Sequence, residues 1–246
     1  MSTNELTAYS LDSPFGKVPC EFLQKGHPRE ANAQFKADPI AVWGQLRGAK
    51  DLLGKSKHFY RMDHAYVGRL EYYRMTRGGF QPSGMLERPA DRWEVLKRKY
   101  NLKMSEWRKG KHILVTLSDQ RTYDFFGLGK WGDAITGLIR SHSEREVILR
   151  PRTETKPLAE QLKDAWCLVT YASNSVIEAL LAGVPVFTLG PSIARPVGCA
   201  DLGKLESPLY PENREEFFRH MSYAQFTNHE FASGFARRTA DENATA

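Results

Sequence analysis

Polar side chains follow apolar runs at three places in the second half of the chain, and their types suit the binding of an anion. The run Cys167–Tyr171 leads into Ser173, Asn174 and Ser175, where a helix-like segment begins. Hydroxyl groups and unpaired backbone N–H groups at the start of a helix form an anion site, here suited to a diphosphate. The same residues are also ordinary helix caps, with Glu178 completing a local capping hydrogen bond.

The other two places offer a guanidinium and a hydroxyl group. Arg150 follows the apolar run Glu146–Leu149 and precedes a proline, so its side chain is well placed to pair a phosphate through two hydrogen bonds. Ser118 follows the run His112–Leu117 and can contribute a backbone amide or its hydroxyl. A solvated loop arginine and an ordinary turn are the alternatives for these two positions. The candidate anion-binding residues are therefore Ser118, Arg150, Ser173, Asn174, Ser175 and Glu178.

An alternation of strands and helices must position these residues. Short apolar, β-rich runs predict strands at Pro39–Leu46, His58–Met62, His112–Leu117, Glu146–Leu149, Cys167–Tyr171 and Pro185–Leu189. Helical spacing and capping residues predict helices at Asp91–Tyr100, Trp131–Ser141, Pro157–Ala165 and Ser175–Ala182. This alternation predicts right-handed βαβ units and parallel sheets covered on both faces. Ligands of such sheets bind at the carboxyl ends of the strands, near a topological switch point.

Two domains are expected. The polar, basic segment Asn101–Lys111 is typical of a linker, which gives an α/β fold of two Rossmann-like domains at residues 1–105 and 106–246. The closing helices, expected at Glu212–Met221 and Thr227–Phe235, are predicted to pack back across the domain junction. The last ten or so residues are expected to form a frayed, flexible tail.

Composition excludes several classes of protein. Of the 246 residues, 41% are hydrophobic and 26% charged, which is ordinary for a soluble globular protein. No run approaches the roughly eighteen apolar residues of a membrane span, and the first residues do not have the pattern of a secretory signal. Cys20, Cys167 and Cys199 show no CxxC spacing, which argues against a disulfide framework and a zinc site and fits a reducing cytoplasm.

The net charge of +6 is concentrated in the first half. Residues 47–111 hold 17 Lys and Arg against 7 Asp and Glu, interleaved with aromatic residues. Such a segment suits a polyanion or an anionic membrane surface, since cations track a phosphate backbone and exposed aromatics stack on bases. Aromatic residues are, however, more often part of a core. The candidate nucleic-acid contacts are Arg69, Arg74, Arg77, Lys97 and Lys99.

Four segments together resemble a known family. The run Asp164–Phe187 (DAWCLVTYASNSVIEALLAGVPVF) resembles the donor-domain signature of GT-B-fold glycosyltransferases, in which a strand, a Ser-containing turn, a Glu-Ala helix and Gly-x-Pro-Val follow one another. Val147–Pro151 (VILRP) is similar to the Arg-Pro-His-Pro strand end of capsule-polysaccharide transferases, with Arg152 in place of the histidine. Phe218–Gly234 (FRHMSYAQFTNHEFASG) is similar to the "AYxQWTxxE" element of phage and capsule-type transferases, and Asp63–Arg69 (DHAYVGR) resembles their "DHGYFGR" segment.

The resemblance implies a glycosyltransferase whose co-substrate is a nucleotide sugar, expected to be UDP-linked, with no further cofactor. An inverting transfer needs a general base for the acceptor hydroxyl and positive groups for the departing phosphate. Asp63 is the first candidate for the base and His64 the second, while a cap or an ion pair with Arg61 or Arg69 is the structural alternative for Asp63. No DxD-like acidic pair occurs in a suitable place, so no obligatory metal is expected.

The basic first half suggests the acceptor. A hydroxymethylated pyrimidine in double-stranded phage DNA fits a basic acceptor domain, and such an enzyme works in the host cytoplasm. A surface polysaccharide or lipid-linked sugar at an anionic membrane face is the competing acceptor. Two further alternatives are a non-catalytic DNA-binding protein with a degenerate pocket and a sugar epimerase of the same fold.

Overall fold

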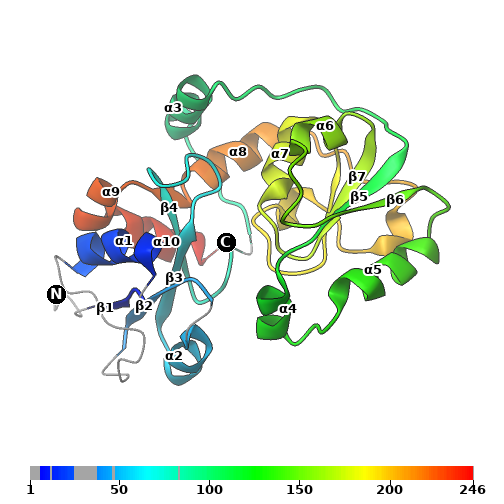
Figure 1. The fold of residues 1–246 in the computed structure, drawn as a ribbon. Helices are drawn as coiled ribbons and strands as arrows, with labels where there is room; N and C mark the ends of the chain where they lie inside the picture. The colour runs from blue at the N-terminus through cyan, green and yellow to red at the C-terminus, as the bar shows by residue number, and fades with distance from the viewer. Residues whose placement is uncertain (1–5, 12, 25–37, 46–47, 83, 246) are drawn as a thin grey trace. The chain divides into compact units, whose positions relative to one another are not determined.

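The structure is a computed structural model that describes residues 6–11, 13–24, 38–45, 48–82 and 84–245. The chain forms two compact units (Figure 1). The first unit contains Met1–Arg92 together with Arg219–Ala246, and the second contains Trp93–Phe218. This division differs from the expected one in two ways. The boundary lies after Arg92 rather than after residue 105, and the last 28 residues belong with the first unit. The acceptor and donor roles given to the two halves remain predictions.

The first unit is built on a mixed five-stranded sheet of order β1-β2-β3-β4-β9. Its strands are β1 (Thr7–Tyr9), β2 (Ile40–Trp43), β3 (Phe59–His64), β4 (Tyr73–Arg77) and β9 (Gln225–Phe226). The first three are parallel, whereas β4 runs antiparallel to β3 and to β9. The sheet is therefore completed by a strand that lies far from the others in sequence.

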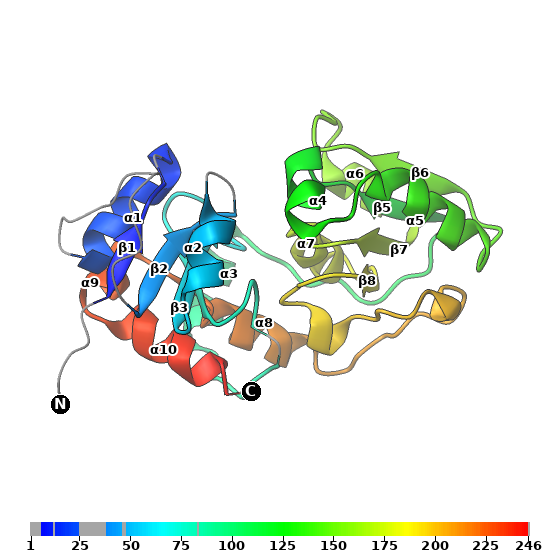
Figure 2. The ribbon, with the colours of Figure 1, turned by 90° about the horizontal axis from the view of Figure 1, so that it is seen from below.

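Both faces of this sheet are covered, because alternate residues of a strand point to opposite faces. Ala41 and Trp43 of β2 face a core shared with α1 (Pro14–Gln24), α9 (Asn228–Ala232) and α10 (Phe235–Asn243). Helices α1 and α9 lie side by side on that face (Figure 2). Ile40 and Val42 face the opposite core, which contains Ala49 and Leu52 of α2 (Ala49–Lys55).

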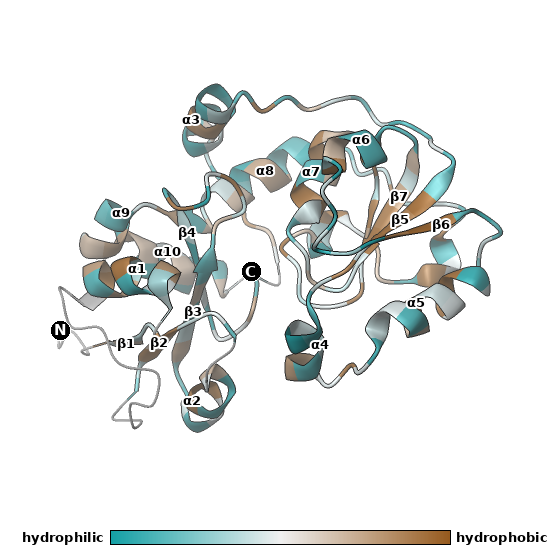
Figure 3. Cartoon of the chain, viewed as in Figure 1, coloured by the Kyte–Doolittle hydropathy of each residue, from teal (hydrophilic) through white to brown (hydrophobic). Residues whose placement is uncertain are grey.

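The second unit contains a fully parallel sheet of order β6-β5-β7-β8. Its strands are β5 (His112–Thr116), β6 (Val147–Arg150), β7 (Ala165–Thr170) and β8 (Val186–Thr188). All residues of β5 and β7 are buried, and hydrophobic residues dominate both strands (Figure 3). Continuous apolar runs of this kind are expected of parallel strands covered on both faces.

The helices of the second unit are short. They are α4 (Gln120–Phe126), α5 (Trp131–Arg140), α6 (Leu158–Leu162) and α7 (Ser175–Leu181), together with the 3-10 turns Arg195–Val197 and Leu202–Lys204. Helices α3 (Asp91–Tyr100) and α8 (Arg214–Ser222) carry the chain across the boundary between the units. Gly183 ends the α7 segment with φ +74°, and an added Cβ would lie 2.0 Å from the Glu106 carbonyl oxygen, so only glycine fits.

The expected elements of the second unit are confirmed within a few residues, and α3 has the expected bounds. The expectation of a frayed tail is wrong, because Phe235–Asn243 form α10, in which Ala236 and Ala240 are buried. Small side chains four residues apart let this helix pack closely on the sheet. The elements β1, α1 and β4 were not expected from the sequence.

Candidate functional site

The parallel sheet of the second unit has a topological switch point between β5 and β7. The chain leaves β5 to form β6 on one side and then returns to form β7 on the other. Ligands of open parallel sheets bind at the carboxyl ends of the strands beside such a point. Three of the expected segments lie at this edge: Ser118 after β5, Arg150 at the end of β6, and Ser173–Ser175 after β7.

Three threonines end neighbouring strands at this edge and share one face of the sheet. Thr116 of β5 is in register with Thr170 of β7, which is in register with Thr188 of β8. Thr170 Oγ1 donates to the Thr116 carbonyl oxygen at 3.1 Å and accepts from the Ser173 amide at 3.4 Å. Thr188 Oγ1 is buried and has no hydrogen-bond partner among the described residues. A buried hydroxyl without a partner is costly, so Thr188 is a candidate contact for a bound molecule.

The loop from Ser173 to Ser175 is held by the same threonines. Ser175 Oγ and Thr116 Oγ1 are 2.8 Å apart, and the Ser175 amide donates to Ser173 Oγ at 3.2 Å. Ser173 therefore caps the start of α7, whereas the Asn174 side chain makes no capping hydrogen bond. Because α7 has only seven residues, its dipole adds little. Anion binding by this loop stays a prediction.

Arg150 and Glu178 lie within electrostatic range of each other. Desolvation raises the pKa of Glu178, and the positive charge of Arg150 opposes that shift. The Arg150 guanidinium donates to the Lys156 carbonyl oxygen at 2.7 Å and also to Gln161 Oε1. Arg150 is therefore held in a defined position at the strand end, while Arg152 next to it makes a longer contact of 3.4 Å with Asp119.

Ser118 follows β5 at this edge, and its part in donor binding stays a prediction. Its backbone amide donates to the Tyr123 hydroxyl at 2.7 Å, so that amide is already satisfied within the second unit. Sequence reasoning also missed Tyr171, which follows β7 at the switch point. Its ring packs against Phe126 at 5.2 Å between centroids, and an added Cβ at Gly190 would lie 2.6 Å from it. Two features of the sequence could have identified Tyr171. It ends the apolar run CLVTY, and a glycine, Gly190, follows the next strand.

Asp63 of the first unit is an ion-paired carboxylate. Its Oδ2 accepts from Arg74 at 2.8 Å and from Arg61 at 2.9 Å, and its Oδ1 accepts from the His64 amide at 2.8 Å. Burial alone would raise the pKa of Asp63, but the Arg74 and Arg61 guanidinium groups outweigh it and lower that pKa to about 2. A carboxylate with this pKa is a weak base at neutral pH. The geometry therefore favours the structural role over the catalytic one for Asp63.

His64 ends β3, and its side chain contacts Phe15, Trp43 and Arg69. Its ring packs edge-on against Phe15 at 5.1 Å and Trp43 at 5.3 Å between centroids. Arg69 Nη2 lies 3.0 Å from His64 Nε2, and the guanidinium is 5.7 Å from the centre of the Phe15 ring. A guanidinium can only donate, so Nε2 accepts and a neutral ring carries its proton on Nδ1. Phe15 was missed because α1 was not expected.

The candidate nucleic-acid contacts do not all offer free positive charge. Arg69, Arg74 and Arg77 belong to the first unit, whereas Lys97 and Lys99 belong to the second. Arg74 is buried against Asp63, and Lys97 pairs with Glu94 at 2.6 Å. A DNA contact at Arg74 is therefore corrected, because a buried, paired guanidinium does not reach a phosphate backbone.

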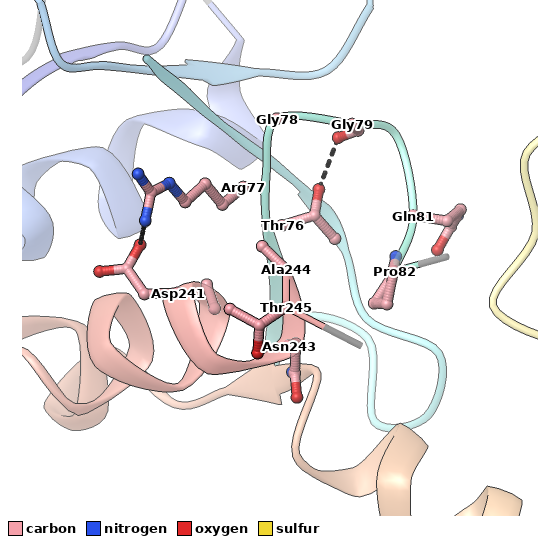
Figure 4. Close-up of a pocket in the computed structure, with 11 residues that line it drawn as sticks. Thr76, Arg77, Gly78, Gly79, Gln81, Pro82, Asp241, Asn243, Ala244 and Thr245 are labelled. Carbon is pink, nitrogen blue, oxygen red and sulfur yellow. Dashed lines mark hydrogen bonds and ion pairs between the residues drawn. The ribbon is translucent and has the colours of Figure 1, made fainter. Parts of the chain in front are cut away.

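Arg77 borders a pocket of about 560 Å3 in the first unit (Figure 4). The pocket lies between the Gly78–Gly79 turn and the end of α10. The Arg77 guanidinium donates to Asp241 at 3.2 Å, so its charge is also matched within the protein.

Several aromatic residues of the basic segment belong to cores as well, since Tyr60, Tyr66, Tyr73 and Trp93 are buried.

The described residues offer neither a metal cluster nor a membrane-spanning helix. They contain no cluster of three or more His, Cys, Asp or Glu side chains that is able to hold a metal ion. No helix in the described part of the chain is long and apolar enough to cross a membrane.

Comparisons with known proteins show the fold. No protein-family model matches the sequence, and no curated protein matches it. The structure is similar to that of the beta Kdo 2,7 transferase of Thermosulfurimonas dismutans KpsC, with a TM-score of 0.56 and 11% identity over 98% of this chain and 99% of that one. It is also similar to the beta Kdo 2,4 transferase of the same KpsC, with a TM-score of 0.52 and 10% identity over 88% and 90% of the two chains. The chain therefore has the GT-B-like, two-unit α/β fold of these glycosyltransferases.

Proposed function

We propose that the chain is a glycosyltransferase that moves a sugar from a nucleotide sugar to a hydroxyl group of a surface glycan. The observation that carries this proposal is the similarity to two Kdo transferases over nearly the whole length of each chain. A fold supports many chemistries, so the proposal also depends on particular residues. These residues lie at the carboxyl ends of the second unit's strands and at the end of β3 in the first unit.

The donor half of the proposal is supported by the switch point of the second unit. Arg150 offers a fixed guanidinium for a phosphate, and Ser173 and Ser175 offer hydroxyl groups on the neighbouring loop. Tyr171 offers a half-buried aromatic ring at the same edge, which is suited to the face of a nucleobase. We keep a UDP-linked donor and a reaction without an obligatory metal as parts of the proposal.

The catalytic step of the proposal is supported by the position of His64 beside Arg69. In an inverting transfer, the acceptor oxygen attacks the anomeric carbon, the bond from that carbon to the phosphate oxygen breaks, and its electron pair leaves with the nucleotide. In this scheme Arg69 turns away from His64, and His64 Nε2 then takes the proton of the acceptor hydroxyl. Asp63 holds Arg61 and Arg74 and takes no proton in this scheme.

A glycan acceptor is favoured over a hydroxymethylated pyrimidine in DNA. The two similar structures described above are both structures of Kdo transferases. Arg74 and Arg77, two of the arginines expected on a DNA-binding face, pair with carboxylates of the same unit. Strong DNA binding needs several cations that are free to displace counterions.

The donor site is tested by calorimetric titration of the full chain with uridine, cytidine and guanosine diphosphates and monophosphates, followed by their sugar conjugates. Arg150→Ala should weaken binding of the preferred nucleotide by about tenfold or more, as expected for a lost charge-assisted contact. Arg152→Ala is the matched control, because this neighbouring arginine is more exposed and should change affinity less than twofold. Equal affinity of wild type and Arg150→Ala would remove Arg150 from the site.

The acceptor is tested with the conjugate that binds. Incubation with acidic and neutral oligosaccharides and with hydroxymethylated DNA, read by mass spectrometry, should add mass to an oligosaccharide alone. Transfer to DNA, with an affinity that falls steeply with salt, would overturn the glycan acceptor and leave the transferase standing. Absence of binding for every nucleotide sugar would contradict the transferase itself.

A further inference from the structure

The loop between β3 and β4, residues 65–72, is held in an unusual conformation. Gly68 has φ +72°, and Leu70 has φ +78°, a value that side chains other than glycine rarely adopt. Leu70 is also exposed, so no core contact of its side chain explains the conformation. Unusual backbone of this kind persists only where surrounding contacts determine it, and it is common at functional sites.

A buried glutamine determines the loop. Gln225 of β9 is fully buried, and its Oε1 accepts from the amides of Tyr66 at 2.9 Å and Val67 at 3.0 Å. Its Nε2 donates to the Val67 carbonyl oxygen at 3.0 Å. Farther along the loop, the Tyr73 hydroxyl donates to the Leu70 carbonyl oxygen at 3.0 Å. These four hydrogen bonds fix the backbone on both sides of Arg69.

Arg69 differs from the other arginines of the described residues 48–92 in having no carboxylate partner there. Arg61, Arg74, Arg77, Arg88 and Arg92 each meet a carboxylate. Arg69 is exposed, and among the described residues its guanidinium meets no carboxylate; it donates to His64 Nε2 and lies over Phe15. The fold therefore supports this exposed guanidinium from two sides and leaves its charge without a counterion in the described chain.

The neighbours of Arg69 suit a sugar that carries an anionic group. An exposed guanidinium recognises a carboxylate through two parallel hydrogen bonds. The Phe15 side chain beside it is 44% exposed, which leaves an aromatic surface for the apolar face of a sugar ring. His64 is the proposed base, and it is within hydrogen-bonding distance of the same guanidinium.

We propose that Arg69, with Phe15 and His64, forms an acceptor subsite for an acidic sugar, whose carboxylate binds the Arg69 guanidinium. When Arg69 turns to the carboxylate, His64 Nε2 loses its donor and becomes available for the proton of the acceptor hydroxyl. Binding of the acidic group thereby prepares the base. This inference rests on the proposed glycosyltransferase function and adds to it the chemical class of the acceptor.

The subsite is tested by binding rather than by turnover. The probes are the methyl glycosides of Kdo and of N-acetylneuraminic acid, each compared with its neutral C1 amide, and binding to the full chain is measured by saturation-transfer NMR and calorimetry. Wild type should bind the carboxylates about tenfold more tightly than the amides, as expected for a charge-assisted contact. Arg69→Met should abolish this preference, and Arg69→Lys should restore part of it.

Arg238→Met is the matched control, because Arg238 is an exposed arginine of the same unit, on α10. It should keep the preference for the carboxylates. An equal preference in wild type and Arg69→Met, or tighter binding of glucose 6-phosphate than of either carboxylate, would overturn the acidic-sugar subsite. Nucleotide binding, measured on the same samples, separates the outcomes: its persistence with no carboxylate preference rejects the subsite alone, and its loss in wild type rejects the proposed function.

Discussion

The two sheets of the protein differ in the kind of polar groups that they contain and in where these groups lie. The sheet of the second unit is parallel and apolar, and its polar groups are threonine and serine hydroxyls that bind neighbouring backbone at one edge. The sheet of the first unit carries charge in its interior, where Asp63 joins Arg61 and Arg74. Polar residues that follow or end a strand therefore play different roles in the two units. In the second unit they form hydrogen bonds at the edge of the sheet, whereas in the first unit they form ion pairs within it.

The largest effect is expected from Asp63→Ala. This change leaves two nearly buried guanidinium groups without their carboxylate, so the first unit should lose about 3–5 kcal/mol of unfolding free energy. Hydrogen exchange of the β3 and β4 amides measures that loss, and the β5 and β7 amides should not change. Glu160→Gln breaks the exposed pair with Lys163 and should cost less than about 1 kcal/mol. A stable Asp63→Ala protein with severely reduced turnover would restore Asp63 as the base.

A somewhat smaller effect is expected from Gln225→Met. The substitution leaves the Tyr66 and Val67 amides without their acceptor, and we expect a loss of about 2–3 kcal/mol in the first unit. It should also release the loop that carries Arg69 and weaken the preference for acidic sugars. Gln120→Met, which removes exposed hydrogen bonds in the second unit, should change stability by less than about 0.5 kcal/mol. Equal effects of the two substitutions would show that the loop is held by something other than Gln225.

Acid should destabilise the first unit before the second. The pKa of Asp63 is about 2 in the folded protein and has a reference value of 3.8, so the folded state favours the carboxylate. Its contribution, about 2 kcal/mol, is complete above roughly pH 5 and is lost as the pH falls from 4 toward 2. Denaturant titrations from pH 6 to pH 3, with hydrogen exchange to separate the units, measure this. A Asp63→Asn protein should lack this part of the pH dependence, and the same slope in both proteins would contradict it.

The smallest effect separates two threonines of the second unit. Thr170→Val removes a hydroxyl that joins the Thr116 carbonyl to the Ser173 amide and should cost about 1–2 kcal/mol. Thr188→Val removes a buried hydroxyl that has no partner in the described chain, so stability should stay equal or rise slightly. Nucleotide affinity should nevertheless fall in Thr188→Val if that hydroxyl meets the ligand. Equal losses of thermal stability in the two variants would show that Thr188 is already satisfied.

The second unit could be predicted because its information is local. The run HILVTL forms β5 and CLVTY covers most of β7, since each strand is buried on both faces and is bounded by polar residues. Ser173–Ser175 and Arg150 were placed at the correct edge for the same reason. Tyr171 was missed because an aromatic residue at the end of an apolar run looks like another core residue.

The first unit could not be predicted as well because its contacts join distant segments. Gln225 and Tyr66 are 159 positions apart, and no local pattern pairs them. Asp63 and Arg74 are 11 positions apart, yet the antiparallel pairing of β3 and β4 places them opposite each other. The excess of basic residues was real, but the sequence did not show which of them were matched by carboxylates. The Pro-containing α1 also gives a weak helical pattern.

The return of the chain to the first unit has a consequence for its synthesis. A ribosome makes β1 to β4 early, but β9 and α10 follow only after the whole second unit. At about 5–20 residues per second, the early strands wait for roughly 7–30 seconds before their sheet can be completed. During that interval the second unit can fold alone, while the apolar face that α9 and α10 will cover stays accessible. Nascent chains are therefore expected to depend on chaperones at this stage more than the finished protein does.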